Sequence, residues 1–480
     1  PKLNQGEVVM KRYAHAVLLA GGISLAALLG GCASGASAKK GETNYSYLDD
    51  QALEKFDADL TRLAAAIQRS DASSEASLRR QIGEQARQYQ GALISALSDG
   101  SSVQRRRLAG VALGFTGDIA VIAPLLSKVN DNDEPESVRH MAVLGLATLD
   151  RKLREYPRHD ELMQTLRGVL ESRDTSASMR RSAVQAYAAA YDRVLNDSIS
   201  PLRDRFMSDP DIGVKITAVN VLGDIGDTAA TQDLIGVGLG SEITDVRAAS
   251  AIALGKIQDA RLIIPALVDS SLNDESAEVR REAVSSLAAH FSADPDTVHS
   301  ALLLGLSDFN DGVRESSALA LARTADVRAI DPLLQATGDR TAIVRRAAAD
   351  GLGQLLNKER EVSAYPLVDL LSDQTPEVRK AAQVSLAKIT TNDWGDDQAR
   401  WRSYFYKTYP ALDPANAYAG QPKPRMTTSI TGGGARSSST SRPSSSRPST
   451  SRPSSGTNRN SSAQPSRNTG TNRSSGTSRR

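Results

Sequence analysis

Small and apolar residues recur along most of the chain at positions that fit one face of a helix. Each copy of the pattern has a basic anchor, usually preceded by valine, with a small residue three positions later and usually leucine seven positions later. These offsets share one face of a helix with about 3.6 residues per turn, and the small residue lets a neighbouring helix approach closely. The anchors are Arg106, Arg139, Arg180, Lys215, Arg247, Arg280, Arg314, Arg345 and Arg379. The chain therefore repeats one helical unit nine times.

A turn and a shorter helix are predicted ahead of each anchor. Aspartate stands six residues before seven of the nine anchors, at Asp133, Asp174, Asp209, Asp274, Asp308, Asp339 and Asp373. Aspartate suits such a turn because its carboxylate accepts hydrogen bonds from backbone N–H groups. The apolar segment before it often has proline near its start, where a missing N–H costs little. The pattern thus predicts a helix, a turn and a second helix in each unit. The units must stack to bury their apolar faces.

This pattern resembles the HEAT repeats, in the short form found in bacteria and in the phycobilisome-lyase group. The resemblance covers about residues 98–407 and implies an all-α fold, a right-handed α-solenoid of about nine helical hairpins. It also implies that aspartate and arginine form a hydrogen-bonded ladder between neighbouring repeats, which is a structural role. The ladder residues would be Asp133, Arg139, Asp174, Arg180, Asp274, Arg280, Asp308, Arg314, Asp339, Arg345, Asp373 and Arg379.

The N-terminal segment has the pattern of a secretory signal. It begins at Met10 with a basic pair, continues through an apolar stretch and ends at Leu-Gly-Gly-Cys, which resembles a bacterial lipobox whose cysteine is lipid-modified. Cys32 is the only cysteine in the chain, so no disulfide is expected. We expect a signal over residues 1–31, with translation starting at Met10. An uncleaved membrane helix is the alternative, although the stretch is short and two glycine pairs interrupt it.

The signal predicts export and a lipid anchor in the cell envelope. Ala33 follows the cysteine, and it is not the aspartate associated with inner-membrane retention in Gram-negative lipoproteins. We therefore expect the periplasmic face of the outer membrane. Residues 32–44 are typical of a flexible spacer. Residues 45–99 predict two helices that cap the first repeat, and residues 100–410 form the solenoid.

The C-terminal part combines a predicted cap with a basic tail, residues 411–480. Trp394 and Trp401 are the only tryptophans, and we expect them to close the exposed end of the array, since terminal repeats differ from internal ones. Residues 421–480 contain eleven Lys and Arg and no acid, so the rest of the chain has a formal charge of −9 against +2 overall. Such a polar segment buries too little apolar surface to offset its ordering entropy, which predicts disorder.

The tail's arginines suggest an electrostatic contact with an anionic envelope polymer or lipid, with strong salt dependence. Nucleic acid fits the charge but not the compartment, and the tail lacks interleaved aromatic residues for stacking on bases. A solvated tail without a binding role, or one that folds back on the acidic array, is the alternative.

Enzyme motifs do not appear in the sequence. Four histidines follow the predicted lipidation site, without the paired His-Glu motifs that hold iron in HEAT-type deoxyhypusine hydroxylases. Neither a Gly-x-Ser-x-Gly elbow nor a Walker or Rossmann glycine pattern occurs. We expect no catalytic residues, metal or cofactor.

A protein-binding scaffold is the function that the pattern favours, because stacked helical pairs expose one long face. The residue after the anchor is often basic, which suggests a stripe for an acidic partner at Arg107, Arg181, Arg281, Arg346 and Lys380. Exposed helix positions also commonly carry Lys and Arg without binding anything. The alternatives are an envelope tether that binds through its tail and, by fold analogy alone, a HEAT-type lyase.

Overall fold

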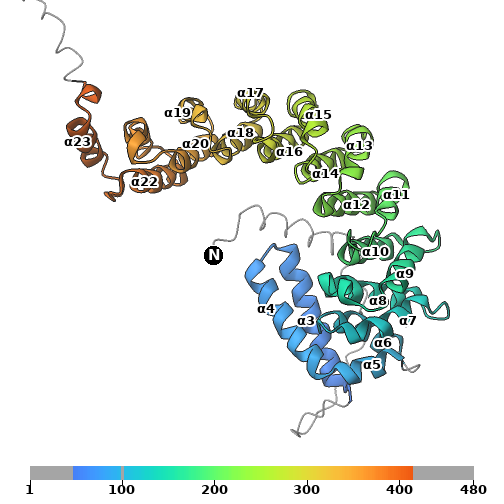
Figure 1. Ribbon diagram of the computed structural model, residues 1–480. Helices are drawn as coiled ribbons and strands as arrows, with labels where there is room; N and C mark the ends of the chain where they lie inside the picture. Colours follow the sequence, from blue (N-terminus) through green and yellow to red (C-terminus); the bar gives the residue numbers. More distant parts are fainter. Residues whose placement is uncertain (1–46, 99–101, 415–480) are drawn as a thin grey trace, which may run out of the picture. The chain divides into compact units, whose positions relative to one another are not determined.

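The described part of the protein is an array of helices joined by short turns (Figure 1). The computed structural model describes residues 47–98 and 102–414, apart from the side chains of residues 358–360. Within these ranges no strand occurs. The predicted all-α fold class is confirmed.

Nine helical hairpins follow one another in the described ranges, and Figure 1 shows their second helices in one row. The hairpins are α5 (Gln90–Ser98) with α6 (Val103–Gly114), α7 (Ile122–Asn130) with α8 (Glu136–Leu149), α9 (His159–Glu171) with α10 (Ala177–Ala190), α11 (Ser200–Ser208) with α12 (Ile212–Ile225), α13 (Thr231–Asp233) and the π-helix η4 (Leu234–Leu239) with α14 (Thr244–Leu254), α15 (Ala260–Asn273) with α16 (Ala277–Leu287), α17 (Pro295–Gly305) with α18 (Asp311–Arg323), α19 (Ile330–Ala336) with α20 (Ala342–Leu355), and α21 (Leu367–Leu370) with α22 (Pro376–Thr390). We call the second helices, from α6 to α22, the inner row.

Small residues let the inner-row helices pack closely. The residue three positions after every anchor is fully buried: Ala109, Ala142, Ala183, Ala218, Ser250, Ala283, Ser317, Ala348 and Ala382. Between α6 and α8 the approach is closer still, because a Cβ on Gly145 would overlap the carbonyl oxygen of Gly110. The repeated small residue therefore sets the helix spacing, and successive units share one continuous core.

A separate helical pair precedes the array: α3 (Asp50–Gln68) and α4 (Ala72–Gln88). The second predicted helix of this region is interrupted at Tyr89, after which α5 pairs with α6 as the first helix of the first repeat. The array therefore begins at Gln90, not at residue 100. Arg105 of α6 forms an ion pair with Asp50 at 2.6 Å, and Arg87 donates a hydrogen bond to the carbonyl group of Thr116 at 3.4 Å.

The last helix, α23 (Gln398–Thr408), packs against α21 and closes the array. Trp401 is fully buried, and its indole N–H donates to the carbonyl group of Gly395 at 3.1 Å. Its ring lies 4.6 Å from that of Trp394, measured between centroids. Both tryptophans thus belong to the packing of the terminal helix, the position expected of a cap.

Several predicted segments lie outside the described residues. They are the signal, Cys32, the spacer of residues 32–44 and the tail from residue 415. In the described part of the chain, none of the helices is both long and apolar enough to cross a membrane.

Candidate binding surface

Ion pairs link neighbouring repeats along the turn edge of the array. Two guanidinium nitrogens of an anchor arginine donate to the two carboxylate oxygens of the aspartate in the next repeat, at 2.7 to 3.1 Å. The pairs are Arg180 with Asp209, Arg247 with Asp274, Arg280 with Asp308, Arg314 with Asp339, and Arg345 with Asp373. A third nitrogen of Arg280 donates to the carbonyl group of Asp274 in its own turn, at 2.9 Å. Each such arginine therefore fixes its own turn and the next repeat.

We call each link between an anchor and the next repeat a rung. The rungs at the first two anchors, Arg106 and Arg139, differ from the predicted ladder. Arg106 pairs with Glu134 at 3.0 Å rather than with Asp133, which is exposed. Arg139 donates to the carbonyl group of Val129 at 3.2 Å, and Asp174 is exposed. The assignment of Asp133 and Asp174 to the ladder is therefore wrong, because at these positions the turns direct the carboxylate to solvent.

A third rung lacks both usual partners. Lys215 replaces the anchor arginine and donates to the carbonyl group of Met207 at 3.4 Å. The position that would accept from it holds Ser241, whose hydroxyl instead accepts from the N–H of Ile243. These two departures from the repeat pattern thus fall on one rung, beside the π-helix η4.

The residues of the predicted basic stripe lie in register on the inner row, but they are not a strip of free positive charge. Lys380 is exposed, whereas the other four are partly buried. Arg281 pairs with Glu282, and Arg346 pairs with Glu315, both at 2.8 Å. Two buried guanidinium nitrogens of Arg107 form no hydrogen bond with any described residue. Burial lowers the pKa of Arg107, although Asp57 of α3 opposes this. Arg107, Arg281 and Arg346 thus have carboxylate neighbours, which corrects the predicted stripe of free positive charge at these three positions.

His140 occupies the stripe position on α8 and is uncharged at neutral pH. Burial lowers the pKa of its imidazole to about 4; Glu136 opposes this effect, whereas the charges of Arg181 and Arg107 add to it. Its Nε2 lies 3.1 Å from the hydroxyl of Ser182. Within the described ranges, His, Cys, Asp and Glu side chains do not gather in threes that could hold a metal ion.

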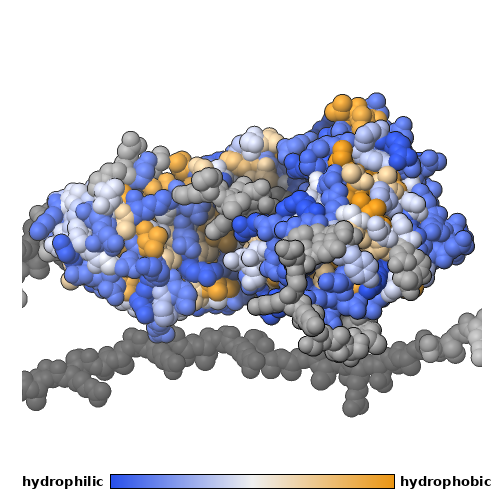
Figure 2. Space-filling model, turned by 90° about the horizontal axis from the view of Figure 1, so that it is seen from below, coloured by the Kyte–Doolittle hydropathy of each residue, from blue (hydrophilic) through white to orange (hydrophobic). Residues whose placement is uncertain are grey.

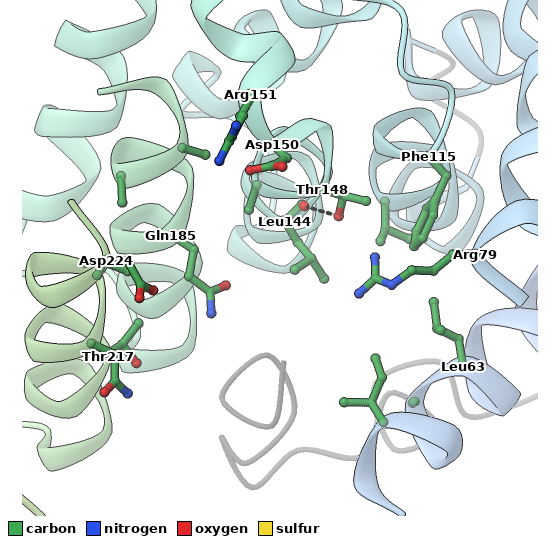
Figure 3. Close-up of a pocket in the computed structure, with 18 of the residues that line it drawn as sticks. Leu63, Arg79, Phe115, Leu144, Thr148, Asp150, Arg151, Gln185, Thr217 and Asp224 are labelled. Carbon is green, nitrogen blue, oxygen red and sulfur yellow. Dashed lines mark hydrogen bonds between the residues drawn. The ribbon is translucent and has the colours of Figure 1, made fainter. Parts of the chain in front are cut away.

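A cleft of about 580 Å³ opens between the α3–α4 pair and the inner row. We call it the hairpin cleft; it is bounded by α3 and α4 on one side and by α6, α8, α10 and α12 on the other. Figure 3 shows Leu63 and Arg79 opposite Gln185, Thr217 and Asp224. This volume lies within the usual range for binding pockets, about 300 to 1,000 Å³. The α3–α4 pair therefore crosses the inner row and does more than cap its end, which corrects the predicted arrangement.

The cleft has an apolar floor. Val111 of α6, Phe115 directly after α6 and Leu144 of α8 line one side. Leu63 and Ile67 face them from α3. Figure 2 shows another aspect of the surface, a face on which hydrophilic residues predominate and hydrophobic ones form separate small patches. An apolar enclosure of this size is a feature that can bury part of a ligand.

Polar groups line the same cleft. Asn220 of α12 is only 9% exposed, and its amide nitrogen has no hydrogen-bond partner among the described residues. Asp224 forms an ion pair with Lys256 at 2.7 Å. The guanidinium of Arg79 lies 6.0 Å from the centre of the Phe115 ring and pairs with Glu75 at 2.9 Å. The cleft thus combines burial with a donor group that has no hydrogen-bond partner in residues 47–98 and 102–414.

The rim of the cleft comes from an irregular repeat. The spacing from Arg139 to Arg180 is 41 residues, the longest in the chain, and the extra residues include the 3-10 helix η2 (Asp150–Glu155). Asp150 has φ +51°, which turns the chain away from α8, and Arg151 then lies on the rim. Arg154 donates to the carbonyl group of Ala189 at 3.0 Å. The sequence analysis missed this site, although the long spacing was its visible signal.

Comparisons with known proteins agree with this architecture. The family model described as HEAT repeats matches residues 199–288 and 299–387, so HEAT repeats are detected from α11 to α22. No curated protein matches the chain. The described protein is thus an α-solenoid that contains HEAT repeats.

Solved structures show distant similarity. An engineered protein has 19% identity and a TM-score of 0.39, with coverage of 67% of this chain and 93% of that chain. A structure of Kap95p with RanGDP has 14% identity and a TM-score of 0.43, with coverage of 86% and 67%. A Kap95:Nup1 complex has 14% identity and a TM-score of 0.49, with coverage of 84% of this chain and 54% of that chain.

Proposed function

We propose that the protein is a non-enzymatic, protein-binding scaffold that is lipid-anchored in the cell envelope. The observation that carries this proposal is the hairpin cleft, about 580 Å³ in volume, which opens onto a row of nine stacked helices. Stacked repeats provide an extended surface for a partner, and the cleft adds an enclosed point on it where a side chain of the partner can be buried.

The ladder supports the scaffold role because it stiffens the surface. A rigid surface loses little conformational entropy when a partner binds, so more of the contact energy appears as affinity. Four consecutive rungs run from Arg247 to Asp373, whereas the Lys215–Ser241 rung lacks the charged pair. Consecutive ion pairs thus hold the C-terminal part of the array together, and a partner can lie along this part.

The lipid anchor and the envelope location rest on the lipobox at Cys32. Acyl chains on that cysteine would hold the array at the periplasmic face of the outer membrane, and residues 33–44 would allow it to move. A single acyl chain binds membranes only marginally, so stable anchoring needs more than one.

The basic tail supports a second candidate function, an envelope tether. Residues 421–480 have eleven cationic side chains and no acid, so contact with an anionic polymer or lipid would weaken steeply as salt rises. The tether and the scaffold predict different effects when the tail is removed.

The experiment is crosslinking in whole source cells, followed by purification of the lipoprotein with and without residues 421–480 and mass spectrometry. The scaffold predicts one protein in near-equal amount with both forms. Capture that depends wholly on the tail and disappears in 0.5 M salt would favour the tether. If neither the full protein nor the form without residues 421–480 captures a protein, the result would contradict the scaffold proposal.

A further inference from the structure

We propose that the hairpin cleft binds an extended, acidic peptide segment of a partner protein, and that Gln185 and Asn220 hold its backbone. This inference rests on the proposed scaffold function and specifies the chemistry of its site. Three features of the cleft carry it: two side-chain amides in register, an apolar floor and a cationic rim.

The two amides occupy equivalent positions on adjacent helices. Gln185 stands five residues after Arg180 on α10, and Asn220 stands five residues after Lys215 on α12. A side-chain amide offers a donor and an acceptor, which is the complement of a peptide group. The amide nitrogen of Asn220 is buried without a partner in the described part of the chain, and a peptide carbonyl would satisfy it.

The spacing of the helices suits an extended chain. Packed helices lie about 8 to 10 Å apart, and an extended chain advances about 3.3 Å per residue. A peptide that crosses the inner row therefore meets Gln185 and Asn220 with peptide groups about three residues apart. Its alternate side chains would face Leu144 and Val221 on the floor.

The charges at the cleft select an acidic segment. Three arginines line it, Arg79, Arg151 and Arg154. Arg151 is exposed and takes part in no hydrogen bond or ion pair with another described residue. Arg79 pairs with Glu75, and Asp224 pairs with Lys256. These pairs leave Arg151 and Arg154 against Asp150 in the lining. Residues 421–480 of this chain contain eleven cations and no acid, so the acidic segment proposed here belongs to a partner protein.

The test uses purified full-length lipoprotein in detergent and a display library of random 12-residue peptides. We expect enrichment of peptides that combine apolar residues with Asp or Glu. A fluorescein-labelled copy of the strongest binder is then titrated by fluorescence anisotropy. Each of Gln185→Ala and Asn220→Ala should weaken binding about tenfold, the effect of one buried hydrogen bond. Arg151→Glu should weaken it by a similar factor and remove its salt dependence.

Matched controls lie on the far part of the inner row. Gln354→Ala on α20 removes an exposed amide and Lys388→Glu on α22 reverses an exposed charge, and both should leave the Kd unchanged. Thermal melting of each variant, followed by circular dichroism, verifies that the array is folded. Because the Asn220 amide nitrogen forms no hydrogen bond with another described residue, Asn220→Ala should melt within about 2 °C of the parent.

Three results with peptides would overturn the inference, and a fourth result comes from a lipid probe. The peptide results are a library without any enriched sequence, enriched peptides that are basic, and an affinity that survives the Gln185→Ala and Asn220→Ala double variant. Saturable binding of the fluorescent fatty acid cis-parinaric acid in the cleft, without peptide enrichment, would assign a lipid ligand instead and also overturn it. Recovery of a cellular partner alongside any of these results would leave the scaffold proposal standing and contradict only the peptide site.

Discussion

The guanidinium of Arg280 donates to both carboxylate oxygens of Asp308, at 2.8 and 3.0 Å, across the boundary between two repeats. Arg280 is 3% exposed, so removal of the carboxylate leaves a buried cation without its partner. We expect Asp308→Ala to lower the free energy of unfolding by about 3 kcal/mol, measured by urea denaturation. Asp133→Ala removes an exposed aspartate at the equivalent sequence position and should change it by less than about 0.5 kcal/mol. Equal losses in both variants would contradict the structural ladder.

Acid should weaken the array through the same carboxylates. The pKa values of Asp209, Asp308, Asp339 and Asp373 lie below the ordinary carboxyl value; burial opposes this, but hydrogen bonds from ladder arginines and backbone N–H groups outweigh it. A lowered folded-state pKa adds stability above the unfolded-state value of about 3.9. That stability is lost as pH falls through the lower folded-state pKa.

The urea midpoint tests this pH dependence. It should be nearly constant from pH 7 to about pH 5 and fall steeply below about pH 4. Asp308→Asn, which cannot ionise, should show a shallower fall from a lower starting stability. An equal acid response in the parent and in Asp308→Asn would exclude Asp308 as a source of the effect.

Two glycine substitutions should have opposite effects on the free energy of unfolding. One glycine lies in the close contact of α6 and α8, whereas the other faces open space. Gly145→Ala places a Cβ against the carbonyl oxygen of Gly110, and the resulting overpacking should cost about 1 to 3 kcal/mol. Gly168→Ala, in the middle of α9, meets open space and should stabilise the protein by about 0.5 to 1 kcal/mol. Thermal denaturation gives both values, and a stabilising Gly145→Ala would show that the helices lie farther apart.

The terminal helix should be separable from the rest of the array. Trp401→Ala removes a fully buried indole, which should cost about 3 to 5 kcal/mol and release α23 from α21. Hydrogen exchange should accelerate in α21 to α23 and stay unchanged in α6 to α12, because repeat arrays lose structure locally. Val384→Ala, at a position that is 51% exposed on α22, is the control. Acceleration throughout the array would contradict a local cap.

The proposed lipid anchor gives a prediction in living cells. Cys32→Ser removes the sulfur to which the acyl group would attach, and we expect the precursor to stay unprocessed and unlabelled by an alkyne fatty acid. The control is Ser34→Ala, which leaves the cysteine intact and should be labelled normally. Labelling that survives Cys32→Ser would contradict lipidation at this residue.

The sequence predicts the repeated parts of the fold because nine copies report the same physical constraint. Ala142 and its equivalents must be small where two helices touch, and this constraint reveals the helix face and its register. Single features carry no such redundancy. The interruption at Tyr89 depends on how α5 docks on α6, and a helical pattern continues through it in the sequence.

The candidate site was hidden for the same reason. The site depends on a non-repeated helical pair, α3–α4, that crosses an irregular repeat. No pattern in a single sequence indicates where this pair lies on the array. The cost of burying the Asn220 amide is likewise visible only once its neighbours are known. The stripe prediction failed at Arg346 because its partner, Glu315, lies one repeat away.

Site-specific photocrosslinking in source cells tests the central claim, that a protein partner binds the inner row. A photoreactive residue is placed at Gln185 in the hairpin cleft, at Gln354 at the far end of the row, and at the exposed Asp269 on α15 as an outer control. The account predicts one discrete protein adduct from Gln185 that is absent from Asp269 and persists without residues 421–480. No adduct from Gln185 and Gln354, or the same adducts from all three positions, would contradict it.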